Sequence, residues 1–336
     1  MDGLVEEENA ASVTYNHSFE NVYLTFEALE DGTFTLNIPA NIDSNYMTSV
    51  SYSTNNGKTW TTTTIDNTAQ TITTPTINAG DKVLWKGVGK SMAKDKYDNN
   101  FSYFSSTGNF NVSGNIMSLL YGDKFANQVV FPSGSTYNFC YLFRYNNKLI
   151  SAENLILPAT TLKQYCYYYM FNGCSKLTTA PELPATTLAK FCYASMFFSC
   201  TSLATSPELP ATTLASNCYD GMFNNCTSLT TAPELPATTL ASNCYASMFS
   251  GTSLTTAPVL PATTLAMSCY QNMFRGCSKL NYIKAMFTTE PSITYTSNWV
   301  QGVAASGTFV KNSAATWTTT GNNAVPSGWT VETASS

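Results

Sequence analysis

The sequence predicts an α/β solenoid built from units of about 26 residues, preceded by an N-terminal all-β sandwich. One hexapeptide recurs at nearly constant spacing through the middle of the chain, which is typical of stacked repeats. Within each unit, apolar residues recur at a helical period beside a shorter, proline-bounded run. We expect a flexible leader over 1–19, the sandwich over 20–115, a solenoid with its N-terminal cap over 116–290 and a C-terminal cap over 291–336.

The repeats are marked by the hexapeptide Leu-Pro-Ala-Thr-Thr-Leu. Its copies follow each other at 26 residues, except for a final step of 25. They begin at Leu157, Leu183, Leu209, Leu235 and Leu260. The short step reflects the run 248–254, which has lost one residue and its second cysteine, and a degenerate earlier copy is visible at 142–149. Because no unit can bury its apolar face alone, we expect the units to form a core by stacking.

Each unit divides into a half with a helical period and a half that predicts a strand and a corner. In the first half, the apolar residues share one arc of about 140° on a helical projection, which predicts a short amphipathic helix. In one unit they are Cys166, Tyr167, Met170, Phe171 and Cys174. The second half carries a proline column, at Pro181, Pro207, Pro233 and Pro258. Because proline cannot donate a backbone hydrogen bond, we expect sheet pairing to be interrupted there.

The unit also resembles a known repeat family. Its segment M-F-x-x-C-T-S-L-T-T-A-P-E-L-P is similar to the pattern A-F-x-x-C-x-x-L-x-x-I…L-P of the BspA-like bacterial leucine-rich repeats, over about residues 138–290. The resemblance implies a curved leucine-rich-repeat-like solenoid with a parallel β-face and short helices behind it. It also implies a bacterial surface protein or, as in similar chains, a prophage tail component. The 26-residue period and the Pro-Glu pair before each Leu-Pro depart from that family.

The segments that flank the repeats have a different sequence pattern. Seven short runs of strand-forming residues predict the sandwich; they are 22–26, 33–38, 50–54, 58–65, 70–77, 82–88 and 110–113. Between two of these runs, Asn56-Gly57 is a signal for a type I′ hairpin turn. After the repeats, Trp299, Trp317 and Trp329 are expected to cover the open end of the solenoid.

Composition excludes several classes of function. The net charge is −5 and the charged residues amount to 11%, which argues against binding to nucleic acid or to anionic membrane surfaces. No apolar run is long enough for a membrane span. The single histidine, His17, is expected to be a surface residue of the leader, so we predict no metal site, no cofactor and no catalytic residue. The first residues lack the features of a signal peptide, and the Thr/Asn-rich surface favours an extracellular or cell-surface location with the leader absent from this chain.

The ten cysteines fall mainly into two columns, separated by eight residues within a unit. This C-x7-C spacing is not that of zinc sites, and eight helical residues span about 12 Å, too far for a disulfide. Neighbours within a column are expected to point in the same direction. We therefore expect free, buried thiols, with Asn146 taking the place of one of them and bonded to backbone groups.

Rows of equivalent side chains predict an extended binding surface, because a catalytic site needs a unique set of differently tuned groups. The strand half supplies the predicted contact residues, Thr178, Glu182, Glu208, Thr230, Glu234 and Thr255. The outward, variable positions are the second choice; they are Tyr168, Tyr169, Phe198 and Arg275. The tyrosine column that begins at Tyr167 could form a ladder for stacking sugars, but its place in the inner arc favours core packing with hydroxyls that reach solvent.

These observations favour a non-enzymatic surface binding or adhesion protein, monomeric, which recognises a host or bacterial surface protein or a glycan through the solenoid. One alternative is a prophage tail or fibre component, with the sandwich as attachment and the repeats as receptor reader. A second alternative is a glycan-active enzyme with an Asp/Glu pair in the N-terminal domain.

Overall fold

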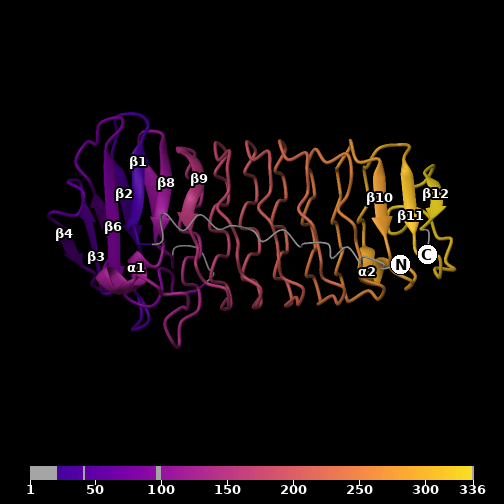
Figure 1. Ribbon diagram of the computed structural model, residues 1–336, viewed down its shortest axis with the longest axis horizontal. Helices are drawn as coiled ribbons and strands as arrows, with labels where there is room; N and C mark the ends of the chain where they lie inside the picture. The colour runs from indigo at the N-terminus through magenta and orange to yellow at the C-terminus, as the bar shows by residue number, and fades with distance from the viewer. Residues whose placement is uncertain (1–20, 41, 96–99, 335–336) are drawn as a thin grey trace, which may run out of the picture.

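The computed structural model describes residues 21–40, 42–95 and 100–334, which form an elongated molecule. Most strands lie at one end, a three-stranded sheet lies at the other end, and a row of stacked coils connects them (Figure 1). The predicted leader over 1–19, with His17, lies outside the described residues.

Two sheets form the N-terminal end. The larger has the strand order β4-β3-β6-β1-β8-β9 and the smaller the order β5-β2-β7. Their bounds are β1 Leu24–Ala28, β2 Phe34–Ile38, β3 Ser49–Ser53, β4 Thr61–Thr64, β5 Gln70–Thr73, β6 Lys82–Val88, β7 Tyr103–Ser106, β8 Phe110–Asn115 and β9 Leu149–Ile156. Seven of these nine strands overlap predicted runs, whereas no predicted run covers β7 or β9. Asn56 and Gly57 both have left-handed φ, 60° and 81°, as the turn prediction requires, but within a longer loop between β3 and β4.

The two sheets pack face to face through aromatic side chains. Phe26 of β1 contacts Phe34 of β2 and Phe104 of β7, with ring centroids 5.3 Å and 4.8 Å apart. Both partners belong to the smaller sheet, so these contacts lie between the layers. The inward residues alternate with outward ones along β2, which is the pattern of a strand with one buried face.

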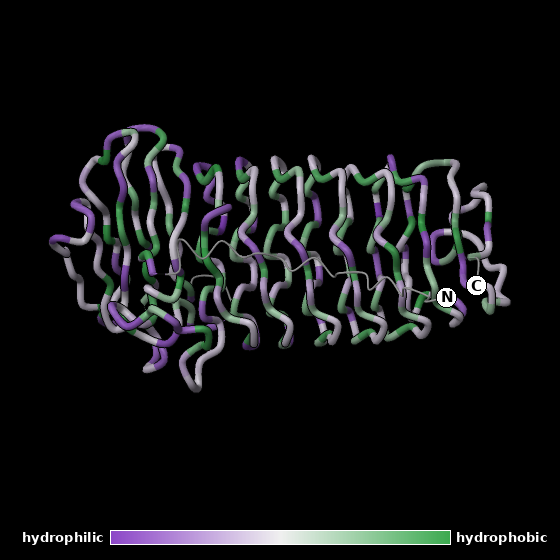
Figure 2. The backbone as a smooth tube through the Cα atoms, in the orientation of Figure 1, coloured by the Kyte–Doolittle hydropathy of each residue, from purple (hydrophilic) through white to green (hydrophobic). Residues whose placement is uncertain are grey.

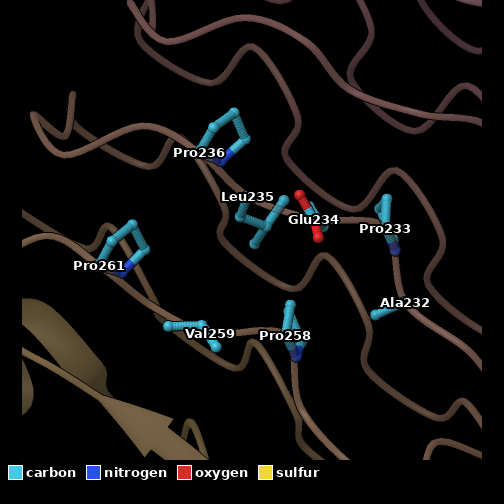
Figure 3. A pocket seen from close by; sticks show the side chains of 8 residues that line it. All are labelled: Ala232, Pro233, Glu234, Leu235, Pro236, Pro258, Val259 and Pro261. Atoms are coloured by element: carbon cyan, nitrogen blue, oxygen red, sulfur yellow. The ribbon is translucent and has the colours of Figure 1, made fainter. Parts of the chain in front are cut away.

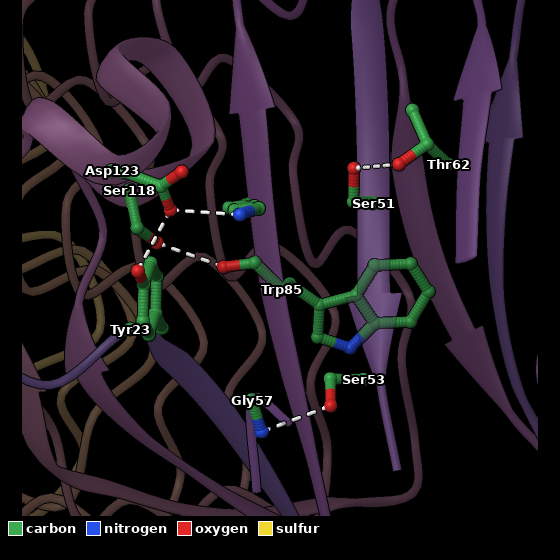
Figure 4. Close-up of polar contacts among 9 residues, drawn as sticks. Tyr23, Ser51, Ser53, Gly57, Thr62, Trp85, Ser118 and Asp123 are labelled. Atoms are coloured by element: carbon green, nitrogen blue, oxygen red, sulfur yellow. Dashed lines mark hydrogen bonds and ion pairs between the residues drawn. The ribbon is translucent and has the colours of Figure 1, made fainter. Parts of the chain in front are cut away.

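A short helical segment closes one side of the larger sheet. It consists of α1, Ser118–Tyr121, followed by the 3-10 turn Gly122–Lys124. The Asp123 carboxylate accepts hydrogen bonds from the Lys86 ammonium and the Tyr23 hydroxyl, both at 2.7 Å (Figure 4). These bonds, that of Lys86 above all, lower the pKa of Asp123. They connect the segment to β6 and to the residue before β1.

The hydrophobic core runs without a break from the sheets into the coils. Strand β9 pairs in parallel with β8, so the larger sheet already includes residues of the repeat region. Phe143 packs against Phe104 at 5.8 Å and against Phe26 at 5.9 Å. One continuous cluster of buried side chains then extends from Leu24 to Trp329.

The prediction of an α/β solenoid of leucine-rich-repeat type is wrong. In the described residues, the α-helices are the four-residue segments Ser118–Tyr121 and Ile293–Thr296, α2, and neither lies within the hexapeptide repeats. The half-unit predicted to be helical consists of consecutive turns instead. The part of the chain that the structure describes is therefore almost entirely β, with three small sheets and with coils that stack without helices.

A left-handed residue at every fourth position prevents the helix. In one unit, Tyr165, Tyr169 and Gly173 have φ of 59°, 55° and 73°, which an α-helix does not allow. The backbone bonds alternate accordingly: Met170 N donates to Tyr167 O three residues back, whereas Tyr167 N donates across to Cys192 O of the next coil. Bonds between coils thus replace the i→i−4 bonds of a helix.

The side chains predicted to be buried are nevertheless buried, as columns that cross the coils. In Figure 2, hydrophobic residues recur along successive coils. The arc residues Cys166 to Cys174 named above are each 0% exposed. Phenylalanines of successive coils stack face to face, as Phe197 and Phe223 do at 5.7 Å. The prediction that the tyrosine hydroxyls reach solvent is wrong for Tyr167 and Tyr193, whose buried hydroxyl oxygens have no hydrogen-bond partner among the described residues.

The C-terminal segment continues the stack. Strands β10, Tyr282–Ala285, β11, Thr308–Lys311, and β12, Thr330–Thr333, form a parallel sheet in that order. Phe274 N donates to Trp299 O, so Trp299 occupies the next coil, and its side chain is fully buried. Trp317 and Trp329 are also buried, while every residue of β12 is exposed at the edge of the sheet.

Candidate functional site

The six predicted contact residues lie on exposed positions of the coils. We call Thr178, Glu182, Glu208, Thr230, Glu234 and Thr255 the threonine–glutamate face. Parallel bridges such as that between Thr205 and Thr231 hold adjacent coils in register beside these residues. The Thr178 hydroxyl also donates to Ile150 O of the preceding coil, at 2.9 Å. The face is thus a set of rows supported by a regular backbone.

One member of this face, Glu234, lies in a pocket of about 440 Å³. The pocket separates two successive coils, which run side by side in Figure 3. Its lining comprises Ala232, Pro233, Glu234, Leu235, Pro236, Pro258, Val259 and Pro261. Glu182 and Glu208 occupy the same column, but they are not among the lining residues. Val259 stands where a glutamate would continue the column.

The proline column accounts for the missing backbone bonds between the two coils that line the pocket. Both segments carry two prolines, which have no N–H to donate. In the described chain, no backbone hydrogen bond connects residues 233–236 to residues 258–261. Pairing resumes further along, where Leu260 N donates to Lys284 O and β10 begins. The expected interruption of sheet pairing is therefore present, and at this place it leaves an opening.

Sequence reasoning missed a second exposed threonine set, which the hexapeptide itself encodes. Each Thr-Thr pair of Leu-Pro-Ala-Thr-Thr-Leu is exposed. The members are Thr160, Thr161, Thr186, Thr187, Thr212, Thr213, Thr238, Thr239, Thr263 and Thr264. Parallel bridges connect Thr161 to Thr187 and Thr213 to Thr239. The signal was present in the invariant Thr-Thr of the five copies.

Three of the four second-choice residues come together on the first coils. The Tyr168 and Tyr169 rings are 4.4 Å apart, and Phe198 lies 6.5 Å from Tyr169. Arg275 is exposed in a later coil, and no ring contact connects it to them in the part of the chain that is described.

These rings belong to a larger group, which we call the aromatic cluster. Its members are Phe101, Tyr137, Tyr141, Tyr165, Tyr168, Tyr169, Phe191 and Phe198. Tyr165 stacks between Tyr137 and Phe191 at 4.8 Å and 4.9 Å. The Arg144 guanidinium lies over the Tyr141 ring at 5.0 Å. Several members occupy left-handed positions that later coils fill with asparagine, serine or glycine, so the cluster is confined to the first coils.

The cysteines are free and buried, as the sequence analysis expects. Thiols of the second column donate to carbonyls of the preceding coil, such as Cys200 Sγ to Phe171 O at 3.1 Å. Asn146, in the same column, donates to Phe104 O. Burial raises the pKa of the Cys226 thiol to about 12 and that of Cys269 to about 11. Nucleophilic thiolates are therefore disfavoured at these positions.

Thiol accessibility provides a test of this arrangement. We expect fewer than two thiols of the native protein to react quickly with a disulfide reagent at pH 8, and all ten to react in denaturant without reductant. The reason is that burial both blocks access and raises the thiol pKa. Ellman titration measures both counts. A count near zero in denaturant would show that disulfides exist and would contradict the structure.

Comparisons of the chain with known protein families, with characterised proteins and with solved structures found no match. The resemblance to BspA-like repeats therefore stands on the quoted residues alone. The described residues contain no group of three or more side chains suited to hold a metal ion. No helix within 21–40, 42–95 or 100–334 is long and apolar enough to cross a membrane.

Proposed function

We propose that this chain is a non-enzymatic binding or adhesion protein of a bacterial surface. It contacts a surface protein or a glycan through the exposed rows of its stacked coils. The observation that carries the proposal is the threonine–glutamate face: equivalent exposed side chains repeat from coil to coil on a backbone bonded in register. A backbone that is already held in register loses little additional freedom on binding, which favours association.

The composition supports the same proposal. Charged residues are scarce, at 11%, so the contact surface consists largely of threonine hydroxyls, proline rings and a few carboxylates. Interfaces need satisfied hydrogen bonds and apolar contact more than net charge. The exposed threonine rows offer hydroxyl donors and acceptors at regular intervals along the molecule.

An array of bacterial and host surface proteins and glycans, probed with the whole chain, tests the proposal. For any ligand found, the triple variant Thr178→Ala, Thr230→Ala and Thr255→Ala is expected to bind at least about tenfold more weakly, a loss of about 1.4 kcal/mol. The matched control changes three exposed threonines outside the coils, Thr61, Thr71 and Thr76, and is expected to bind normally.

Circular dichroism and the melting temperature show whether each triple variant is folded. Equal weakening in the control triple variant, or unchanged binding in the test variant, would exclude the threonine–glutamate face as the contact surface. Conversion of any array ligand into a product would contradict the non-enzymatic part of the proposal.

A further inference from the structure

The pocket between residues 232–236 and 258–261 differs chemically from the rest of the threonine–glutamate face. Its walls are proline rings together with Ala232, Leu235 and Val259, none of which has a polar side chain. The one charged side chain of the lining is Glu234. The side chains of the pocket therefore combine apolar surface with a single negative charge.

Glu234 has no partner of opposite charge. In the described residues, no lysine or arginine lies within ion-pair distance of its carboxylate, which is exposed. In the adjacent coil the equivalent position is Val259, 49% exposed, so the pocket also lacks a second carboxylate that would repel the first. Because valine stands at position 259 in place of a glutamate, an apolar surface lies beside the Glu234 carboxylate.

We propose that this pocket binds a lysine or arginine side chain of a partner protein. The long aliphatic stem of such a side chain packs on apolar surface while its charged end reaches a polar group. Here the stem lies against the proline rings and Val259, and the ammonium or guanidinium bonds to the Glu234 carboxylate. The net charge of −5 also favours association with basic partners.

The lining also distinguishes a protein side chain from a saccharide. A sugar presents many hydroxyls, which need several donors and acceptors in the site. Apart from Glu234, the lining side chains supply neither, so any other polar atoms that line the pocket belong to the backbone. The inference rests on the proposed binding function and narrows it, because it makes the partner a protein that presents a basic residue to this coil.

Small probes test the pocket without knowledge of the partner. N-acetyl-lysine amide and N-acetyl-arginine amide are titrated into the whole chain, with N-acetyl-norleucine amide as a probe that has the stem but no charge. Methyl-labelled NMR signals of Leu235 and Val259 report occupancy. We expect saturable shifts with a dissociation constant of about 1 mM for the basic probes, and at least fivefold weaker binding for norleucine.

Two matched variants decide the role of the carboxylate. Glu234→Gln is expected to weaken binding of the basic probes at least fivefold, whereas Glu153→Gln, which changes an exposed residue of β9 outside both the lining and the threonine–glutamate face, leaves their binding unchanged. Both side chains are exposed, so both variants are expected to fold. Equal affinity for lysine and norleucine probes, absence of shifts with either basic probe, or equal effects of the two variants would overturn the inference.

This test and the array test fail independently. If the basic probes bind as expected but the array finds no ligand, the pocket assignment stands and the adhesion proposal falls. If the array finds a ligand whose binding is unaffected by Glu234→Gln, the proposed function stands and the assignment of the pocket to a basic side chain of that partner falls.

Discussion

Replacing Phe223 by alanine is expected to lower the free energy of unfolding by about 3–5 kcal/mol. Phe223 is 0% exposed and stacks between Phe197 and Phe249, with ring centroids 5.7 Å and 5.8 Å away. Its removal leaves a cavity inside the column, because neighbouring rings are held at the coil spacing by backbone bonds such as Phe223 N to Met248 O. The site cannot collapse freely, so the loss falls toward the upper end of the range.

Urea unfolding followed by circular dichroism measures this loss. The control is Thr238→Ala, at an exposed position of the neighbouring half-unit, and it is expected to change stability by less than about 0.5 kcal/mol. A loss below about 1 kcal/mol for Phe223→Ala would show that the phenylalanine column is not a packed core.

Gly114→Ala is expected to lower the free energy of unfolding by about 2–4 kcal/mol. Gly114 lies in β8 with φ of +80°, a left-handed conformation that favours glycine. A Cβ at this position would lie 2.1 Å from the backbone oxygen of Tyr23 and 2.9 Å from its carbonyl carbon. Because Tyr23 leads into β1, which pairs with β8, relief of the clash requires movement of paired strands.

Gly80→Ala separates the cost of a left-handed backbone conformation from the cost of the clash with Tyr23. Gly80 has a similar φ of +89°, but nothing lies within 4 Å of the place where its Cβ would be. The conformational penalty alone is about 1–2 kcal/mol, so Gly80→Ala is expected to be the milder variant by calorimetry or urea unfolding. If both variants lose the same stability, the close approach of Tyr23 to Gly114 carries no cost and the expectation is wrong.

The buried positions of the coils could be predicted although their secondary structure could not. Over nine residues, Cys166 to Cys174, a period of 3.6 and a period of four place nearly the same side chains on one side. The sequence pattern therefore identified the core columns. It is equally compatible with a helix and with repeated turns. Hydrogen bonds to the neighbouring coil decide between them, and those bonds connect residues about one unit apart.

The candidate site was predictable to a similar degree. Exposure of the threonine and glutamate columns followed from their polar character at equivalent positions of the repeat. The pocket at Glu234 could not be predicted, because it depends on how far two proline-containing coils separate. The aromatic cluster draws on Phe101 as well as on three coils, and contacts over such separations are invisible to a local pattern.

By itself the sequence determined the repeat, its stacking, the buried columns and the exposed rows, because each follows from apolar and polar residues recurring at fixed spacing. Only the tertiary structure decided that no helix forms in the repeats, that β9 extends the sheet of the N-terminal strands, and that the C-terminal segment continues the stack. The physical reason is the same in each case: a backbone N–H bonds to whichever carbonyl the neighbouring segment presents, and that neighbour is known only once the coils are in place.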